Sequence, residues 1–333
     1  MNENKTWEDS RNLRGEYLKE VVQPLLPNAK FGYTLQAGDF ETTSNTFNGS
    51  LSSDGIFKNS NYEFEGEERF LHFTNLTSLD AIIKSGHFRM SDFTNLSDKT
   101  ELNYASDIFN DNPYFKLQKD KIEEEKKKLF CLSVCENKLD TIQNTFMWNE
   151  YGNKGSGVII DFSLNCSESN RFSIGHIKYG QEELKVVEDL KQRLIKFSEV
   201  NTFKPNNAVQ MITALLAFHK SLKYKSEKEL RILFTINGLE LEKTEYPTIE
   251  PTINSRNQTT SFNKVFLEGR NTLSKSNKSM FPEIKINRII LGYNLTYEEK
   301  EGAITLLNSL KNNYEKLDFD IYHMNDDLEL TDL

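Results

Sequence analysis

The spacing of apolar residues divides the chain into stretches of strand and stretches of helix. Strands are indicated where apolar residues alternate with polar ones or form a short run, and helices where they recur every three or four positions. On this basis we predict strands at 69–75, 87–91, 129–136, 156–162, 171–180, 227–236, 285–294 and 318–323. We predict helices at 7–24, 77–86, 116–128, 141–152, 181–199, 206–222 and 297–313, with Thr77 capping the second and Gly86 ending it.

The order of these elements predicts an α+β fold. Strands and helices are mixed without a regular strand–helix–strand period, and the chain has neither a GxGxxG motif nor a P-loop, which argues against a Rossmann domain. Residues 36–62 are rich in Ser, Thr, Asn and Gly and are predicted to form a long loop. We divide the chain into an N-terminal helical and loop extension at 1–65, a main domain at 66–325 and an acidic tail at 326–333.

Composition indicates a soluble, cytoplasmic protein. The 333 residues carry a net charge of −9, so the whole surface does not attract nucleic acid. Basic stretches at 217–231 and 264–288 fit either a phosphate-bearing ligand or an ordinary solvated face. We find no signal peptide and no apolar run of about 18 residues that would span a membrane. Three cysteines, without a Cys or His pair to complete a zinc site, predict a reducing compartment and no metal.

The stretch KYKSEKELRILF at 223–234 is the first candidate for chemistry. In an extended strand Glu227, Glu229 and Arg231 lie on one face, because side chains alternate. This E-x-E-x-R pattern fits two interpretations. It is either a solvent-exposed ladder of ion pairs or the edge of a catalytic site.

Two other predicted strands carry candidate binding residues. His72 and Thr74 share a face, where they either hold sugar hydroxyls or, for His72, fill a place in the core. In strand 129–136, Ser133 lies on a face of small side chains. That face either admits a flat ring or packs under a helix.

The aromatic residues of MWNEYG at 147–152 are the next candidates. Trp148 and Tyr151 are three positions apart and therefore share a helix face. They either stack on a base or a nicotinamide, or they belong to the core. The stretch LSDKTEL at 96–102 has capping spacing, and we interpret it as mostly structural.

These segments, taken in order, resemble a bacterial family long described only as a domain of unknown function, whose members often sit near abortive-infection and other phage-defence genes. The resemblance covers about residues 68–325, and W-x-x-Y-G and E-x-E-x-R are its most specific parts. The chain departs from it at Ser97, where the family usually has Asn, and at Ser226, where an aromatic residue is common. The segments that carry it are HFTNLTSLDAIIKSGHFRMSDFTNLSD, FCLS, MWNEYGNKGSGVIIDF, the E-x-E-x-R strand and RIILG.

The same layout resembles the ADP-ribosyltransferase fold, which implies a split β-sheet core with surrounding helices. By this resemblance Glu229 is the catalytic acid and Glu227 orients the acceptor. By the same resemblance His72 binds the ribose of NAD, Thr74 lies beside the nicotinamide, and Ser133 belongs to the second motif. Tyr151, with Trp148 as the second choice, stacks on the nicotinamide. The residue types add Lys225, Lys228 and Arg231 at the pyrophosphate or a nucleic-acid acceptor.

The resemblance implies an NAD-dependent, metal-independent ADP-ribosyltransferase that acts as a toxin or anti-phage effector. NAD is its substrate, the acceptor is nucleic acid (RNA or DNA) or protein, and an antitoxin is a candidate partner. Two alternatives stay open. One is a non-catalytic sensor of nucleic acid or a phage component. The other is a metal-dependent nuclease in which a divalent ion is held by Asp98, Glu101, Glu227 and Glu229.

Overall fold

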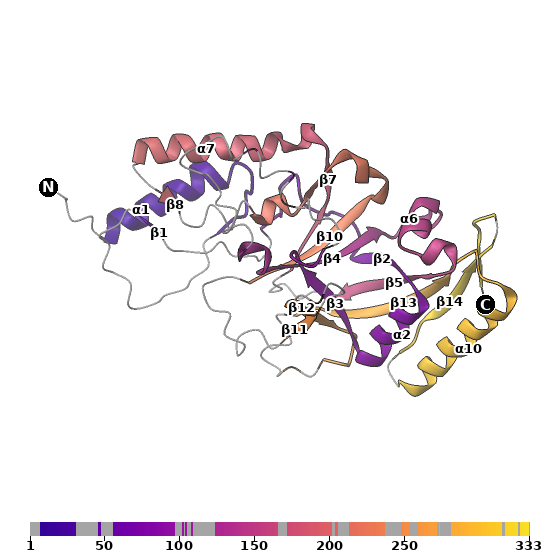
Figure 1. The fold of residues 1–333 in the computed structure, drawn as a ribbon. Coiled ribbons are helices and arrows are strands. Elements are labelled where there is room, and N and C mark those ends of the chain that lie inside the picture. Colours follow the sequence, from indigo (N-terminus) through magenta and orange to yellow (C-terminus); the bar gives the residue numbers. More distant parts are fainter. Residues whose placement is uncertain are drawn as a thin grey trace.

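A large mixed β-sheet forms the centre of the molecule (Figure 1). The computed structural model describes residues 7–30, 46–47, 56–96, 102, 104, 108, 124–165, 172–201, 204–205, 213–236, 248–253, 257, 259–271, 273, 281–314, 317–325 and 327–332. Among them, the sheet contains eleven strands: β2 (Arg69–Thr74), β3 (His87–Asp92), β4 (Leu129–Glu136), β5 (Val158–Asn165), β6 (Phe172–His176), β10 (Glu229–Thr235), β11 (Ile249–Ile253), β12 (Thr259–Phe266), β13 (Glu283–Leu291), β14 (Asp320–Met324) and β15 (Leu330–Asp332).

The sheet divides at the middle of β4. On one side β4 pairs with β10 along its length, and β10 pairs in turn with β6. On its other side β4 pairs with β3 at Phe130 and Cys131, and with β2 at Cys135 and Glu136. Ser133 lies between these two pairings, so the strands on that side separate around it.

Helices cover both faces of the sheet (Figure 1). The N-terminal helix and α7 lie side by side, whereas α2 and α10 lie together elsewhere on the molecule. The α- and π-helices are α1 (Trp7–Tyr17), which continues as a π-helix (Leu18–Val22), α2 (Leu76–Ser85), α5 (Leu139–Ile142), α6 (Thr145–Glu150), α7 (Lys185–Asn201) and α10 (Tyr297–Asn313). Three 3₁₀ turns are η2 (Asn153–Gly155), η3 (Gln181–Leu184) and η4 (Leu222–Glu227), and two short ribbons pair β1 (Thr46–Phe47) with β8 (Lys204–Pro205) and β7 (Lys178–Tyr179) with β9 (His219–Lys220).

The buried side chains of β4 belong to different hydrophobic clusters. Phe130, Leu132 and Val134 join α2 and α10 in the cluster on one face. On the other face, Cys131 packs with the helices α1 and α7, whereas Cys135 packs with α5 and α6. The cluster that contains Cys131 also includes residues from the N-terminal 65, so the predicted extension shares a core with the main domain. These residues are Tyr17, Val21, Val22, Leu26, Ala29, Phe57 and Tyr62.

Most predicted elements are confirmed, including the strand 129–136 and the helix 297–313 with their bounds. The predicted helix 77–86 forms, but Asn75 caps it, because its side chain accepts a hydrogen bond from the backbone N–H of Ser78 at 2.7 Å. The predicted helix 141–152 is two short helices, since Asn144 caps a second one, α6. The predicted strand 171–180 is likewise divided into β6 and β7.

The predicted helix 206–222 is wrong at its end, where residues 219–220 form β9 and a 3₁₀ turn follows. Part of the predicted acidic tail forms β15, which pairs with β14. Most of the predicted loop 36–62 and of the helix 116–128 lies outside the described residues. Among the helices that the structure describes, none is long and apolar enough to cross a membrane.

Candidate functional site

The two carboxylates of the E-x-E-x-R stretch meet because the backbone changes conformation between them. Glu227 is the last residue of η4, and Glu229 is the first residue of β10. Lys228, between them, has a left-handed backbone with φ 46° and ψ 42°. The prediction that Glu227 lies on the strand is therefore wrong. The exposed ion ladder is also excluded, because each carboxylate residue is only 4% exposed.

Two cations neutralise this buried pair. Nζ of Lys220 lies 2.9 Å from Oε2 of Glu227 and 2.5 Å from Oε2 of Glu229. Arg231 donates to Oε1 of Glu229 from Nε at 3.1 Å and from Nη2 at 2.9 Å. Arg231 also donates to the carbonyl of Ala217 and is 1% exposed, so it contacts Glu229 rather than the predicted pyrophosphate or acceptor. Among the described residues, the cluster thus contains two negative and two positive charges.

Two hydroxyl groups from solvent-exposed residues bond to the buried carboxylates. Oγ of Ser133 donates to Oε1 of Glu229 at 2.6 Å, and the phenol of Tyr151 donates to Oε1 of Glu227 at 2.6 Å. Ser133 is exposed at the place where the sheet divides, and Tyr151 is 45% exposed. A ligand that approaches either carboxylate from this side therefore meets a hydroxyl first.

The environments of the two carboxylates shift their pKa values in opposite directions. Burial raises the pKa of Glu227, and the opposing effects of Lys220 and Tyr151 do not cancel it. Burial acts the same way on Glu229, but the charges of Arg231 and Lys220 and the hydrogen bonds outweigh it and lower the pKa of Glu229 to about 2. Burial and the hydrogen bond to Glu227 raise the pKa of Tyr151. Paired carboxylates with separated pKa values are typical of sites that use one as a base and one as a fixed charge.

The β7–β9 ribbon supplies two partners of Glu229 that the sequence did not predict. Tyr179 and Lys220 are opposite each other in this parallel pair. The Tyr179 hydroxyl accepts a hydrogen bond from the backbone N–H of Glu229 at 2.9 Å, while Lys220 contacts its carboxylate. Lys220 and Arg231 belong to the predicted basic stretch 217–231, and both are buried rather than part of a solvated face.

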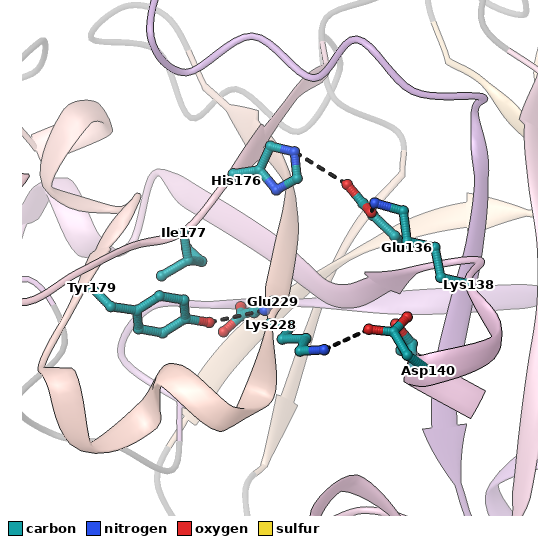
Figure 2. A pocket seen from close by; sticks show the side chains of 9 residues that line it. Glu136, Lys138, Asp140, His176, Ile177, Tyr179, Lys228 and Glu229 are labelled. Carbon is teal, nitrogen blue, oxygen red and sulfur yellow. Dashed lines mark hydrogen bonds and ion pairs between the residues drawn. The ribbon is translucent and has the colours of Figure 1, made fainter. Parts of the chain in front are cut away.

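A pocket of about 300 Å³ lies beside Glu229 and Tyr179, and Figure 2 shows its lining residues. Its charged side chains are already paired, with His176 Nε2 at 3.3 Å from Glu136 and Lys228 Nζ at 2.6 Å from Asp140. Tyr179 forms part of the wall, and its hydroxyl bonds to Glu229 in Figure 2. The lining consists of Glu136, Lys138, Asp140, Thr141, His176, Ile177, Tyr179, Lys228 and Glu229.

The structure does not bring His72 and Thr74 to the carboxylates. Leu71 is opposite Cys135 in the sheet, and Cys135 is opposite Glu229, so these three side chains lie on one face. His72 therefore lies on the other face, where its ring packs against Phe88 and burial lowers its pKa. Its Nδ1 donates to the Ser133 carbonyl at 3.2 Å, where β2 and β3 separate from β4.

Trp148 occupies the core, which was the structural alternative for it. Its side chain has no exposed surface, and its indole N–H donates to the carbonyl of Ile142 at 2.7 Å. The ring packs edge-on against Phe73 and Tyr293. Trp148 therefore has no surface on which a nicotinamide could stack, in contrast to Tyr151.

The residues proposed for a metal site are only partly described. Ser97, Asp98 and Glu101 lie outside the described residues, as do Lys275 and Lys278 of the second basic stretch. In the part of the chain that the structure covers, no group of three or more His, Cys, Asp or Glu side chains could hold a metal ion. Glu227 and Glu229 instead have a lysine between them.

One comparison with known proteins gives a match. A family model described as a protein of unknown function (DUF2971) matches residues 147–232. No curated protein and no solved structure matches the chain. The matched segment runs from α6 into β10 and contains six residues of the site, which are Tyr151, Tyr179, Lys220, Glu227, Glu229 and Arg231. The chain is thus similar, over this segment, to a family of unknown function, whereas its link to phage defence and to ADP-ribosyltransferases stays a prediction.

Proposed function

We propose that the protein is an NAD-dependent ADP-ribosyltransferase that acts as a toxin or anti-phage effector. Glu229 is its catalytic carboxylate, and Glu227 accepts a proton from the acceptor. The acceptor is nucleic acid or protein. The role in defence rests on the family resemblance alone, whereas the chemistry is argued from the site.

The observation that carries this proposal is the state of Glu229. Its carboxylate is fixed by Lys220 and Arg231, its pKa is lowered, and the exposed hydroxyl of Ser133 bonds to it. A ribose hydroxyl that bonds to this carboxylate beside the Ser133 hydroxyl would contact an ionised, immobile group. Fixed negative charge of this kind stabilises positive charge that develops in a transition state without reorganisation.

The proposed reaction places such a charge next to Glu229. The bond between C1′ of the ribose and the nicotinamide nitrogen breaks, and nicotinamide leaves with the electron pair. The sugar becomes oxocarbenium-like, as in glycoside hydrolysis, and a carboxylate close to the ring stabilises it. The acceptor nucleophile then forms the new bond to C1′.

Glu227 and Tyr151 fit the other half of the reaction. Glu227 has a raised pKa, so it is a better proton acceptor than Glu229 for the proton that the nucleophile releases. Tyr151 is 45% exposed and keeps one edge on Glu227, so its ring is available as a wall for the nicotinamide. In this proposal His72 supports the site by holding the Ser133 carbonyl.

The charge balance of the cluster argues against the nuclease alternative. A divalent ion bound by Glu227 and Glu229 would have to displace Lys220, whose ammonium group contacts both carboxylates. Arg231 would remain on Glu229 and repel the ion. The same ion pairs favour a reaction that needs a fixed carboxylate and no metal.

The test uses purified protein with two labels on NAD, one in the nicotinamide and one in the adenine. We expect nicotinamide release with or without a chelator, and transfer of the adenine label to one class of acceptor when RNA, DNA and total protein are offered separately. Release that a chelator abolishes would favour the metal-dependent alternative. Folded protein that releases no nicotinamide with any acceptor, but binds nucleic acid, would favour the non-catalytic sensor.

A further inference from the structure

We propose that Lys220 is a positioning residue that keeps Glu227 and Glu229 ionised together and so keeps Glu227 available as the proton acceptor. This inference rests on the proposed transferase function. It adds a residue that neither the E-x-E-x-R pattern nor the family resemblance assigns.

The Lys220 side chain is buried and contacts both carboxylates. Its Nζ is within 2.9 Å of one carboxylate and 2.5 Å of the other, and its side chain is 9% exposed. Arg231 contacts Glu229 and no carboxylate oxygen of Glu227 in any hydrogen bond between described residues. Lys220 thus contacts both acids and joins them.

Two carboxylates that share one cation in a buried site respond strongly to its loss. Without Lys220, Glu227 and Glu229 would face each other with one positive charge between them, and like charges at this range favour protonation of one member. Arg231 stabilises ionised Glu229, so the proton goes to Glu227. A protonated Glu227 cannot accept the proton of the nucleophile.

The groups around the pair support this assignment. Among the described residues, the ionisable groups next to the pair are the phenols of Tyr151 after α6 and Tyr179 from β7, the thiol of Cys135 from β4, Lys220 from β9 and Arg231 from β10. Glu136 from β4 lines the same pocket as Glu229 and is paired with His176. Burial raises the pKa of the two phenols and of the thiol, so these three groups stay neutral near pH 7. Among these groups, Lys220 and Arg231 are therefore the cations that balance Glu227 and Glu229.

The backbone holds Lys220 in place independently of the acids. β9 is a parallel partner of β7, and Gly180 N–H bonds to the Lys220 carbonyl at 3.0 Å. The adjacent residue His219 is buried and bonds to the phenol of Tyr62 at 3.0 Å. The ammonium group is therefore presented to the carboxylates by a fixed strand.

The test follows the titration of Glu227 and Glu229 through the ¹³Cδ signals of labelled glutamate, assigned with Glu227→Gln and Glu229→Gln. Four proteins are compared without NAD: wild type, Lys220→Gln, Lys220→Arg and Lys228→Gln. Lys228 is the matched control, since it is a neighbouring lysine whose partner is the exposed Asp140. We expect Lys220→Gln to raise the pH at which Glu227 titrates by about one unit or more. Lys220→Arg should keep the wild-type value, and Lys228→Gln should not change it.

The activity assay adds a second readout. The acid limb of kcat/KM for nicotinamide release should move to higher pH in Lys220→Gln by the same amount as Glu227. A wild type that releases no nicotinamide would contradict the proposed function. The titration is measured on the protein without NAD, so it still tests the effect of Lys220 on Glu227 and Glu229 in that case. An unchanged Glu227 titration in folded Lys220→Gln overturns the inference.

If Lys220→Gln as a single change leaves the protein unfolded near pH 7, that outcome also tests the inference. The inference then predicts that the variant regains its fold as the pH falls and Glu227 takes up a proton. It also predicts that Lys220→Gln combined with Glu227→Gln is folded at neutral pH. If the single variant stays unfolded at every pH and the double variant is unfolded as well, Lys220 is a purely structural residue and the inference is wrong.

Discussion

The hydroxyl of Ser133 lies 2.6 Å from Oε1 of Glu229, and it connects an exposed residue to a carboxylate that is only 4% exposed. This relationship exists because β2 and β3 pair with opposite ends of β4 and leave Ser133 between them. The division of the sheet thus gives solvent a way to the catalytic carboxylate proposed above.

Ser133→Ala removes this hydroxyl and leaves Lys220 and Arg231 on Glu229. A hydrogen bond to a charged group contributes roughly 1.5–3 kcal/mol, so we expect a loss of about 10- to 100-fold in kcat/KM for nicotinamide release. Ser156→Ala, which removes an exposed hydroxyl bonded to the Asn153 carbonyl, is the control and should keep full activity. Equal activity of the two variants would show that the Ser133 hydroxyl contributes nothing to the reaction at Glu229.

Tyr151→Phe is expected to change the pH dependence of the reaction. The phenol donates to Glu227 and stabilises its ionised form, so its loss raises the pKa of Glu227 further. The acid limb of the kcat/KM profile for nicotinamide release should therefore move to higher pH while the ring, and its contact with NAD, stays. A profile with the wild-type acid limb would contradict the assignment of Glu227 as the proton acceptor.

Trp148→Ala is expected to reduce stability. Trp148 is fully buried and its N–H is bonded to Ile142, so truncation leaves a cavity and an unpaired carbonyl. Replacing a buried aromatic residue by Ala costs roughly 3–5 kcal/mol of unfolding free energy. Denaturant unfolding measures this cost, and a loss below about 1 kcal/mol would place Trp148 outside the core.

Glu229 is expected to make the protein sensitive to acid. Its folded pKa is lowered from 4.5 to about 2, so the stability that its ionised form contributes is present above pH 4.5 and is lost as the pH falls toward 2. Glu227 acts in the opposite direction, because its folded pKa is raised. The free energy of unfolding should therefore fall less steeply between pH 4.5 and 2 in Glu229→Gln than in the wild type. Equal slopes would mean that Glu229 titrates normally in the folded state.

The elements with strong local signals are those that the sequence predicted well. Strand 129–136 alternates between two buried faces, and helix 297–313 begins with a capping box between Thr296 and Glu299. Both signals are complete within one segment. The left-handed backbone at Lys228, by contrast, is not signalled by a Gly or Asn, so the sequence predicts the start of the charged strand two residues too early.

The partners of Glu229 were harder to predict because they depend on contacts between distant segments. Lys220 reaches it from a two-residue strand that pairs with Tyr179, some forty positions earlier in the chain. No periodicity exists in so short a strand. Spacing alone does not separate Trp148 from Tyr151. Because α6 ends at Glu150, the Trp148 ring lies in the core and the Tyr151 hydroxyl bonds to Glu227.

The most direct measurement of the central claim is the rate of nicotinamide release from labelled NAD by the wild type, Glu229→Gln and Glu298→Gln, each shown to be folded. Glu298 is an exposed glutamate in the first turn of α10 and serves as the matched control. We expect release by the wild type and Glu298→Gln, and a loss of about 100-fold or more in Glu229→Gln, as for removal of a charge-stabilising group. Release by Glu229→Gln at the wild-type rate would contradict the assignment of Glu229 as the catalytic carboxylate.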